Sequence, residues 1–549
     1  MPIHWYATAG LLMLLSPAAR PADEPLKIST YATAGAVNRY MNTPEGRQNV
    51  VSVLKRFRIS KVYVEGNRGD VWVPVDLLRA VRDDLTSQGF QTSGGAGPLP
   101  GKTFGVHVSG RQPWLDFRAE KTQQDVARAF TESAAVFDEM IVDDFYCFDE
   151  GPSPQYRRDL LVGLIDPMML KPARAVRPSF RLIIKIPQWY DRLQEYGYDP
   201  ARMTAASDRI WVGAETRNPD TRASGHVQPT EGYVNFRWLT SVAGSKIGGA
   251  WFDEYDCTAQ NYLDQAYQSV LAGARELTLF SLQDLMRGHP GHPLLEAALP
   301  KLFELAEKVR GRPASGIAYY KPSSSDGEEN LYLMEYLPMV GLPIVPVAKF
   351  PSGWPVIFLG SQAADRDLLA RMKRELARGG TLVLTPALLR RMDPRAATMA
   401  GVTVSPRLQP GVVGGLEVDL SLAVTRAQTR ISIPADGKKI PLLTMRKNGR
   451  GRILVANVRA FSAADWPSER SEKLFPPLRL GLPELAQPLA DALRRDLLEP
   501  LKTSLAAPSK VAFYMLGDAR VLYNFRNEPV EVKLDGKVIQ IPANGLVWR

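Results

Sequence analysis

Two strand-like stretches decide the fold: RLIIKIPQWY at residues 181–190 and RIWVGAETRN at residues 209–218. Each begins with apolar and β-branched residues and ends with polar and aromatic ones. A short helix-like segment around residues 189–196 separates the two strands. A strand, a helix and a second strand in this order predict a parallel βαβ unit.

The same alternation extends outward over residues 27–310. We expect eight strands, at residues 27–36, 61–66, 90–97, 140–146, 181–186, 209–214, 248–252 and 277–282. We expect a helix after each, at residues 46–57, 74–88, 122–137, 155–168, 189–196, 234–243, 262–274 and 294–310. Eight βα units predict a closed (β/α)8 TIM barrel. A doubly wound open sheet is the alternative, because the third strand is rich in glycine and poorly marked.

The remaining sequence predicts two further domains. Residues 316–385 alternate strands and helices in a flavodoxin-like α/β layout, and a helix at 484–504 closes that region. Residues 510–549 form strand after strand, with Asp535-Gly536 and Asn544-Gly545 as hairpin turns. The expected organisation is therefore a signal peptide at 1–22, the barrel at 23–312, the α/β domain at 313–505 and a small antiparallel β domain at 506–549.

Composition and the N-terminus narrow the classes of protein. The chain has 549 residues, 45% of them apolar and 23% charged, which is ordinary for globular domains. The net charge of +10 comes without a Lys/Arg block, so we expect no nucleic-acid partner. The apolar run at residues 9–15 and the small residues before Asp23 predict a signal peptide and a periplasmic or secreted protein. No longer apolar run follows, so we expect no membrane insertion.

Acidic residues collect where the predicted strands end. In a barrel, these ends form one face, and active sites lie there. The acids that follow strands two, four, six and seven are Glu65, Asp143, Asp144, Glu215, Asp253 and Glu254. Aromatic, arginine and amide side chains are interleaved with them, as a site for sugar rings and hydroxyls requires. Glycosidases need two carboxylates at the scissile bond. The alternative is that these acids only cap the following helices.

Lys185 lies inside the apolar strand LIIKIP, whose outer face helices should cover. Burying its charge against helices would be costly, so we expect it to point toward the barrel axis. Asp144 and Glu215 follow the two flanking strands. We therefore expect Lys185 to pair with one of them and to lower the pKa of that carboxyl. The alternative is an earlier strand end with Lys185 exposed.

Strand alternation ranks the acids, because successive side chains face opposite ways. Only one of Asp143 and Asp144 should enter the site, and we favour Asp144. By the same rule we favour Asp253 over Glu254. The candidate catalytic residues are Asp144 as nucleophile or base, with Glu215 or Asp253 as general acid. The candidate substrate-binding residues are Glu65, Asp143, Tyr146, Lys185, Trp189, Arg217, Arg237, Trp251 and Glu254.

Other chemistries find less support. The five histidines show no HExxH spacing, and His289 and His292 read as turn residues rather than ligands. We expect no metal site and no cofactor. No G-x-S-x-G elbow is present. Cys147 and Cys257 could pair in an exported protein or remain free thiols.

The order of domains resembles the barrel β-galactosidases with a trimerisation domain. The stretch PVIFLGSQAADRDLLARMKRELARGGTLVLTP at residues 355–386 is similar to their glutamine-amidotransferase-like second domain, and VLYNFRNEPVEVKLDGK at 521–537 is similar to their β domain. The catalytic motif departs from that family, which has Asn-Glu after strand four. FDEMIVDDFYC at 137–147 looks more like the α-galactosidase group, in which an Asp at this position is the nucleophile and the second acid follows strand six.

The expected function is therefore that of an exported glycoside hydrolase acting on an oligo- or polysaccharide. The alternative is a non-catalytic carbohydrate-binding barrel of the periplasm. The motifs IKIPQWYD, GAETR and GAWFDEYDC also resemble uncharacterised bacterial proteins. The second domain, which lacks a convincing Cys-His-Glu triad, could join copies of the chain into a homo-oligomer.

Overall fold

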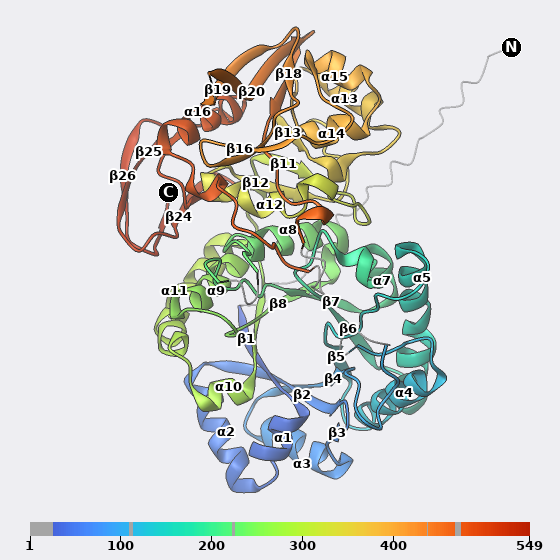
Figure 1. The fold of residues 1–549 in the computed structure, drawn as a ribbon. Coiled ribbons are helices and arrows are strands. Elements are labelled where there is room, and N and C mark those ends of the chain that lie inside the picture. The colour runs from blue at the N-terminus through green and yellow to red at the C-terminus, as the bar shows by residue number, and fades with distance from the viewer. Residues whose placement is uncertain (1–25, 109–113, 222–224, 436, 467–473) are drawn as a thin grey trace, which may run out of the picture.

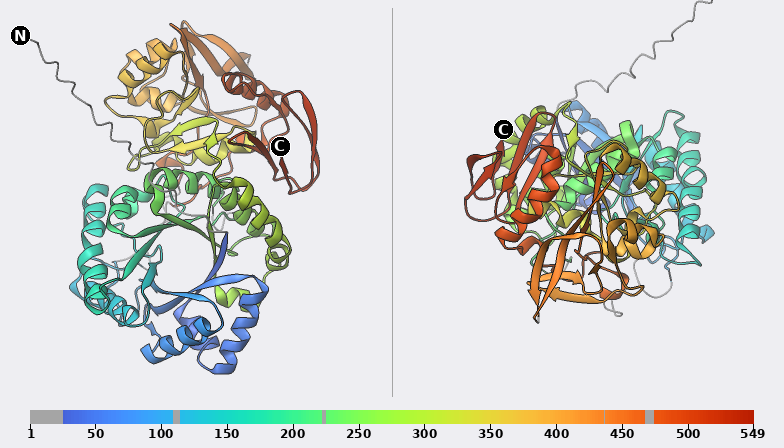
Figure 2. Two further views of the ribbon diagram at one scale, coloured as in Figure 1. Left: turned by 180° about the vertical axis from the view of Figure 1, so that it is seen from behind. Right: turned by 90° about the horizontal axis from the view of Figure 1, so that it is seen from above.

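The computed structural model describes residues 26–549 except 109–113, 222–224, 436 and 467–473. The expected signal peptide lies outside the described residues. Figure 1 shows a barrel formed by the first half of the chain, with the second half packed against one of its sides. Seen from the opposite direction, the strands surround the barrel axis and the helices surround the strands (Figure 2).

The barrel closes with eight parallel strands, which confirms the expected fold. The strands follow one another in chain order, and β1 pairs with both β2 and β9. They are β1 (Lys27–Ala32), β2 (Ile59–Arg68), β4 (Gln91–Gly97), β5 (Glu139–Val142), β6 (Arg181–Ile186), β7 (Arg209–Gly213), β8 (Ile247–Asp253) and β9 (Glu276–Phe280). The two-residue β3 (Val71–Trp72) only extends the end of β2 as an antiparallel pair.

The poorly marked third strand is real, and its glycines have a packing reason. A Cβ atom on Gly95 would lie 2.7 Å from the Tyr31 ring, and one on Gly97 would lie 2.7 Å from Glu65. Large side chains from β1 and β2 therefore occupy the space that β4 leaves empty. The apolar signal of β4 was weak because its neighbours supply the packing atoms.

The outer helices are α2 (Pro44–Arg56), α3 (Val75–Ser87), α4 (Glu120–Ala134), α5 (Pro154–Leu164), α7 (Pro200–Ala206), α8 (Glu231–Ala243), α9 (Ala259–Leu271) and α11 (Gly291–Val309). The helix expected at 155–168 changes at Leu164 into a π-helical turn, Ile165–Leu170, where Pro167 cannot donate to the helical ladder. The segment expected to be helical at 189–196 holds only a 3-10 turn, Leu193–Tyr196, and α7 follows it.

Aromatic side chains fill the barrel interior. Tyr31, Tyr63, Trp211 and Trp251 form one buried cluster with two isoleucines. Trp211 donates from Nε1 to Thr278 Oγ1 across the barrel at 2.9 Å. This packed layer closes the barrel, so a ligand can enter only at its ends.

The second domain has the strand order of a flavodoxin-like sheet. Its parallel strands lie in the order β12-β11-β13-β14-β21, the 2-1-3-4-5 arrangement of that fold. They are β11 (Ile317–Tyr320), β12 (Ile344–Val347), β13 (Val356–Leu359), β14 (Thr381–Leu384) and β21 (Gly451–Ala456). An unpredicted hairpin, β19 (Gln428–Ala435) with β20 (Lys438–Asn448), extends the sheet in the antiparallel sense. Between β11 and β12 the chain forms only one short helix, α12 (Leu333–Tyr336), between two 3-10 turns.

The C-terminal strands form small antiparallel sheets after helix α16 (Gln487–Leu498). One sheet contains β10 (Ala314–Ser315), β23 (Val511–Leu516), β24 (Ala519–Asn524) and β27 (Leu546–Trp548), and the other contains β22 (Leu505–Ala506), β25 (Val530–Leu534) and β26 (Lys537–Ile541). Asp535 and Gly536, with φ of 49° and 81°, turn the chain from β25 to β26 as expected.

Both C-terminal parts pack directly on the barrel. Trp238 of α8 donates to the Lys321 carbonyl at 2.9 Å, and Tyr190 donates to Glu335 at 3.1 Å. From the small sheet, Tyr523 donates to Asp264 of α9 at 2.6 Å. Among the described residues, no helix combines the length and hydropathy that crossing a bilayer requires.

Candidate active site

A cavity of about 330 Å³ opens at the carboxyl ends of the barrel strands. Its walls combine acidic, basic and aromatic side chains with two residues of the second half of the chain. The lining residues are Arg68, Trp114, Asp143, Asp144, Phe145, Lys185, Gln188, Trp189, Glu215, Arg217, Trp251, Asp253, Tyr255, Phe280, Leu474 and Phe475. The position matches the face on which barrel enzymes carry their active sites.

Lys185 is the centre of this cavity. The strand β6 directs its side chain inward, where Nζ lies 4.5 Å from the centre of the Trp251 ring. The same nitrogen contacts Asp143 at 3.4 Å, Asp144 at 2.9 Å and Glu215 at 2.5 Å. The sequence predicted that Lys185 would pair with an acid after one of the two flanking strands. In the structure, its ammonium group contacts three carboxylates, two after β5 and one after β7.

Asp144 and Glu215 lie close enough to act on one bond. Because both contact Lys185 Nζ, Asp144 Oδ2 and Glu215 Oε1 are separated by no more than the two contacts combined, about 5.4 Å. Retaining glycosidases hold their carboxyl groups about 5–5.5 Å apart, and inverting enzymes hold theirs about 6.5–9.5 Å apart. Glu215 Oε2 accepts no hydrogen bond from the described residues.

Asp143 and Asp144 both enter the cavity, so the expectation that only one would do so is wrong. Strand β5 ends at Val142, and the chain turns at once. Asp143 Oδ1 accepts a hydrogen bond from the Asp144 backbone at 2.8 Å, which folds the two carboxyl groups toward the same side. Alternation applies within a strand and fails in the turn after it.

The pKa values of the two aspartates are shifted in opposite directions. Burial raises the pKa of Asp144 to about 7, and the negative charges of Asp143 and Glu215 add to this effect against the attraction of Lys185. For Asp143, burial acts in the same direction, but Lys185 and Arg68 outweigh it and lower its pKa to about 2. Arg68 Nη2 lies 2.9 Å from Asp143 Oδ2. Lys185 acts on the pKa of Asp144 in the expected direction, but burial and the two neighbouring acids outweigh it.

The two acids at the end of β8, Asp253 and Glu254, lie in different surroundings. Asp253 lines the cavity and forms an ion pair with Arg217. Glu254 points away from the cavity and lies 2.8 Å from His292 Nε2. Asp253 is thus the acid placed beside Glu215, and Glu254 is not part of the cavity wall.

Glu254, His289 and His292 lie close enough together to suggest a metal site. However, His292 Nδ1 accepts from the His289 backbone at 3.1 Å, and His289 Nδ1 accepts from the Gly291 backbone at 3.0 Å. Each neutral imidazole then carries its proton on Nε2, which leaves no lone pair for a metal. The 2.8 Å contact between Glu254 and His292 instead connects the end of β8 to α11.

Glu65 is buried beneath the cavity and does not line it. It accepts from Tyr31 at 2.6 Å and from the Ala34 backbone at 2.6 Å, and it forms an ion pair with Arg68 at 2.8 Å. Arg68 connects Glu65 to Asp143 and reaches the cavity itself. Arg68 is the last residue of β2, three residues after Glu65, and was not predicted as a site residue.

Tyr146 and Arg237, which were predicted to bind substrate, do not line the cavity. Tyr146 is fully buried, donates to the Leu161 carbonyl at 2.5 Å and packs against Phe117, so it supports the wall from behind. Arg237 lies at the opposite end of the barrel, beside Arg275 and Gly273. It belongs to α8, and its side chain reaches the strand beginnings instead of the strand ends.

The aromatic residues in the cavity are Trp114, Phe145, Trp189, Trp251, Tyr255 and Phe280. Trp189 and Trp251 were predicted. Tyr255 is 45% exposed and is the most open of them. Cys147 and Cys257 do not form a disulfide with each other, and burial raises the pKa of Cys257 to about 12.

A family model described as "probable glycosyl hydrolase, catalytic domain" matches residues 16–293. An uncharacterized protein of Saccharolobus solfataricus is 22% identical over 324 residues. The match covers 52% of this chain, and it spans about half of that relative's length (52%).

Several solved structures share the fold over nearly the whole chain. A β-galactosidase of Bacillus circulans sp. alkalophilus has 12% identity and a TM-score of 0.64, covering 96% of this chain and 98% of that one. An α-L-fucosidase of Paenibacillus thiaminolyticus has 12% identity and a TM-score of 0.60, covering 95% and 98%. At these identities the likeness shows the architecture of barrel, second domain and C-terminal strands.

Proposed function

We propose, because this chain belongs to the probable glycosyl hydrolase family through its catalytic domain, that Asp144 and Glu215 are the two carboxylates that cleave the glycosidic bond. The observation that carries this proposal is the shared contact with Lys185, which holds the two groups within about 5.4 Å. This upper limit lies below the roughly 6.5–9.5 Å of inverting enzymes, which favours a retaining mechanism. The substrate is an oligo- or polysaccharide bound in the cavity at the barrel mouth.

Asp144 serves as the general acid and Glu215 as the nucleophile, which reverses the roles that we expect from the sequence alone. Its pKa of about 7 keeps a large fraction protonated near neutral pH. Its side chain is 15% exposed, compared with 3% for Asp143 and 4% for Glu215, so it is the most accessible of the three acids. In the first step Asp144 gives its proton to the leaving oxygen while a Glu215 oxygen bonds to the anomeric carbon and the glycosidic C–O bond breaks.

In the second step a water molecule attacks the anomeric carbon. Asp144, now ionised, removes a proton from that water, and the ester bond to Glu215 breaks. The hydrolysed sugar leaves, Glu215 is again a carboxylate and Asp144 is again protonated. Two displacements at one carbon return the original anomeric configuration.

Lys185 and Asp143 position this pair. Lys185 partly neutralises Glu215, and Asp143, held by Arg68, fixes the ammonium from the other side. Asp253 and Arg217 form the adjoining wall, where a carboxylate and a guanidinium can bind sugar hydroxyls. Trp189 and Tyr255 offer ring faces for the apolar sides of sugars.

The test is a hydrolysis screen on aryl glycosides, beginning with galactosides and fucosides because the structural relatives include a β-galactosidase and an α-L-fucosidase. Asp144→Asn and Glu215→Gln should each abolish turnover on the substrate that the wild-type protein cleaves. Glu254→Gln is the matched control, because this acid follows β8 but lies outside the cavity. The Glu254→Gln variant should keep the activity of the wild-type protein. Full turnover by either catalytic variant would contradict the assignment.

We also propose export and assembly on sequence grounds alone. The apolar run at residues 9–15 followed by small residues supports cleavage near Ala22 and a periplasmic or secreted location. The amidotransferase-like second domain, whose strand order supports that comparison, could join copies of the chain. N-terminal sequencing of the exported protein and its mass in solution test these two points.

A further inference from the structure

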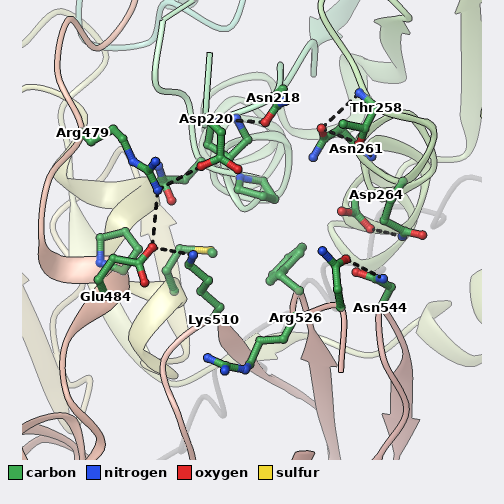
Figure 3. Close-up of a pocket in the computed structure, with 18 of the residues that line it drawn as sticks. Asn218, Asp220, Thr258, Asn261, Asp264, Arg479, Glu484, Lys510, Arg526 and Asn544 are labelled. Atoms are coloured by element: carbon green, nitrogen blue, oxygen red, sulfur yellow. Dashed lines mark hydrogen bonds and ion pairs between the residues drawn. The ribbon is translucent and has the colours of Figure 1, made fainter. Parts of the chain in front are cut away.

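A second cavity of about 520 Å³ lies between the barrel and the C-terminal strands. The loop after β7 separates it from the catalytic cavity: Arg217 lines one and Asn218 lines the other, and the two share no lining residue among those described. Figure 3 shows Thr258, Asn261 and Asp264 on the barrel side and Arg526 and Asn544 facing them from the C-terminal sheet. Its size lies within the range of small-molecule sites.

The charged residues around this cavity are already neutralised. Each cation has an acidic partner: Arg479 pairs with Asp220 at 2.9 Å, Lys510 pairs with Glu484 at 2.5 Å, and Arg526 pairs with Glu528. A site built for phosphate or another anion would leave cations available for the ligand. The paired charges therefore favour an uncharged ligand.

Side-chain amides line the cavity, and each is fixed at one end. Asn218 accepts from the Asp220 backbone, Asn261 accepts from Thr258, Gln260 donates to Asp264, and Asn544 donates to Asn527. Within the described residues, the opposite ends make no hydrogen bond. The open groups are the NH2 groups of Asn218, Asn261 and Asn527 and the carbonyl oxygens of Gln260 and Asn544.

Asp264 adds an oriented acceptor. Its side chain is buried, and both Tyr523 and Gln260 donate to Oδ1, at 2.6 and 2.7 Å. Oδ2 receives no hydrogen bond from any described residue, and the residue lines the cavity. Burial raises the pKa of this carboxyl to about 6, so it can also donate when protonated.

The open groups thus comprise three donors and three acceptors around one space. Hydroxyl groups both donate and accept, so a ligand with several hydroxyls can satisfy both kinds. The half-buried ring of Phe525 lines the same space and offers an apolar surface. Alternating hydroxyls beside an apolar face are the surface of a sugar ring.

We infer that this cavity is a second saccharide-binding site, separate from the catalytic cavity, that takes an uncharged oligosaccharide between α9 and the C-terminal sheet. It would hold a saccharide chain beside the catalytic face without taking part in bond cleavage. The inference depends on the cavity's own residues and does not require the catalytic assignment to be correct.

The experiment is calorimetric titration of the full-length Glu215→Gln protein with lactose, cellotetraose, xylotetraose and β-1,4-galactotetraose. Asn527→Trp, added to this background, fills the cavity from an exposed position. Lys533→Trp is the matched control, because it places the same side chain on an exposed position of the neighbouring strand β25 outside the cavity. Phe525→Ala provides a second cavity variant, and thermal unfolding checks that all proteins fold.

We expect at least one probe to bind in the control at a site that Asn527→Trp weakens at least tenfold and that Phe525→Ala also weakens. No binding by any probe, or equal binding in the two Trp variants, would overturn the inference. Preferential binding of an anionic heparin-derived tetrasaccharide at this site would overturn the choice of an uncharged ligand. Absence of turnover in the wild-type protein would instead contradict the proposed catalysis, so the two failures are distinguishable.

Discussion

Two buried lysines of the barrel, Lys61 and Lys185, differ in the number of carboxylates that each contacts. Near the strand beginnings, Lys61 lies 2.7 Å from Glu139, which also accepts from Ser93 at 2.9 Å and lies 3.4 Å from Arg181. Near the strand ends, Lys185 contacts Asp143, Asp144 and Glu215, and Arg68 adds a second contact to Asp143. The first cluster has enough positive charge for its acid, and the second has a surplus of acids.

The pKa values follow this difference. Burial tends to raise the pKa of Glu139, but Lys61 and the hydrogen bond from Ser93 lower it overall. Burial raises the pKa of Asp144 to about 7, because Lys185 is shared and two other acids lie nearby. A balanced buried ion pair serves the fold, whereas an unbalanced one creates a carboxyl that can exchange a proton near neutral pH.

The largest expected effect on activity comes from Glu215→Gln. Loss of the proposed nucleophile should lower kcat by on the order of 10⁴-fold with a small change in thermal unfolding. Glu139→Gln should leave kcat of the folded protein within about twofold, because that acid lies at the other end of the barrel. Steady-state kinetics and calorimetry on both variants measure the contrast.

Removing each lysine should sharpen the same contrast. In Lys61→Met, Arg181 remains as the cation next to the buried Glu139, and Arg181 is more exposed than Lys61. We expect this substitution to cost about 3–5 kcal/mol of stability with little change in kcat. Lys185→Met should lower kcat by about 10²-fold, because Asp144 and Glu215 lose the group that holds them together. Equal activity losses in the two variants would remove the functional distinction between the clusters.

The pH dependence should also differ between the clusters. Because Asp144 must be protonated to act, activity should fall as pH rises above about 7. Its folded pKa lies above the ordinary value, so its contribution to stability is complete below about pH 4 and is lost as pH rises through 7. Asp144→Asn should therefore raise the melting temperature above neutral pH by roughly 2 °C.

Glu139 should act in the opposite direction, since its folded pKa is lowered. The stability it contributes is present above its ordinary pKa and is lost as pH falls through the folded value. Thermal unfolding of Glu139→Gln and Asp144→Asn across pH gives both signs. A melting temperature of Asp144→Asn below that of the wild-type protein above neutral pH would contradict the raised pKa.

The smallest effect is expected at the edge of the structural cluster. Ser93→Ala removes one neutral donor from Glu139 while Lys61 remains in place. We expect a loss of about 1 kcal/mol and unchanged kinetics, measured by chemical denaturation and the aryl glycoside assay. A loss of activity here would show that the two clusters are coupled through the barrel interior.

The sequence predicted the fold well because its signals are local. Seven apolar strands, most of the helices and the Asp535-Gly536 turn each lie within one short segment. Lys185 was also placed correctly, since a charge in an apolar strand has few alternatives. The hairpin β19–β20 was missed because its strands are partly exposed and carry charged residues, so no apolar run marks them.

Details of the site depended on contacts between distant segments. The turn after Val142 brings both aspartates inward, and only the structure shows that Lys185 is shared among three acids. Trp114, Leu474 and Phe475 line the cavity from loops that strand periodicity does not place. Arg237 and Tyr146 were misplaced because a residue's position along the chain does not fix the direction of its side chain.

The most direct test of the central claim is to identify the carboxylate that bonds to the sugar. The 2-deoxy-2-fluoro analogue of the best aryl glycoside should slow hydrolysis of the glycosyl-enzyme enough for peptide mapping by mass spectrometry. We expect a covalent adduct on Glu215. An adduct on Asp143, Asp144 or Asp253, or hydrolysis with inverted configuration and no adduct, would contradict it.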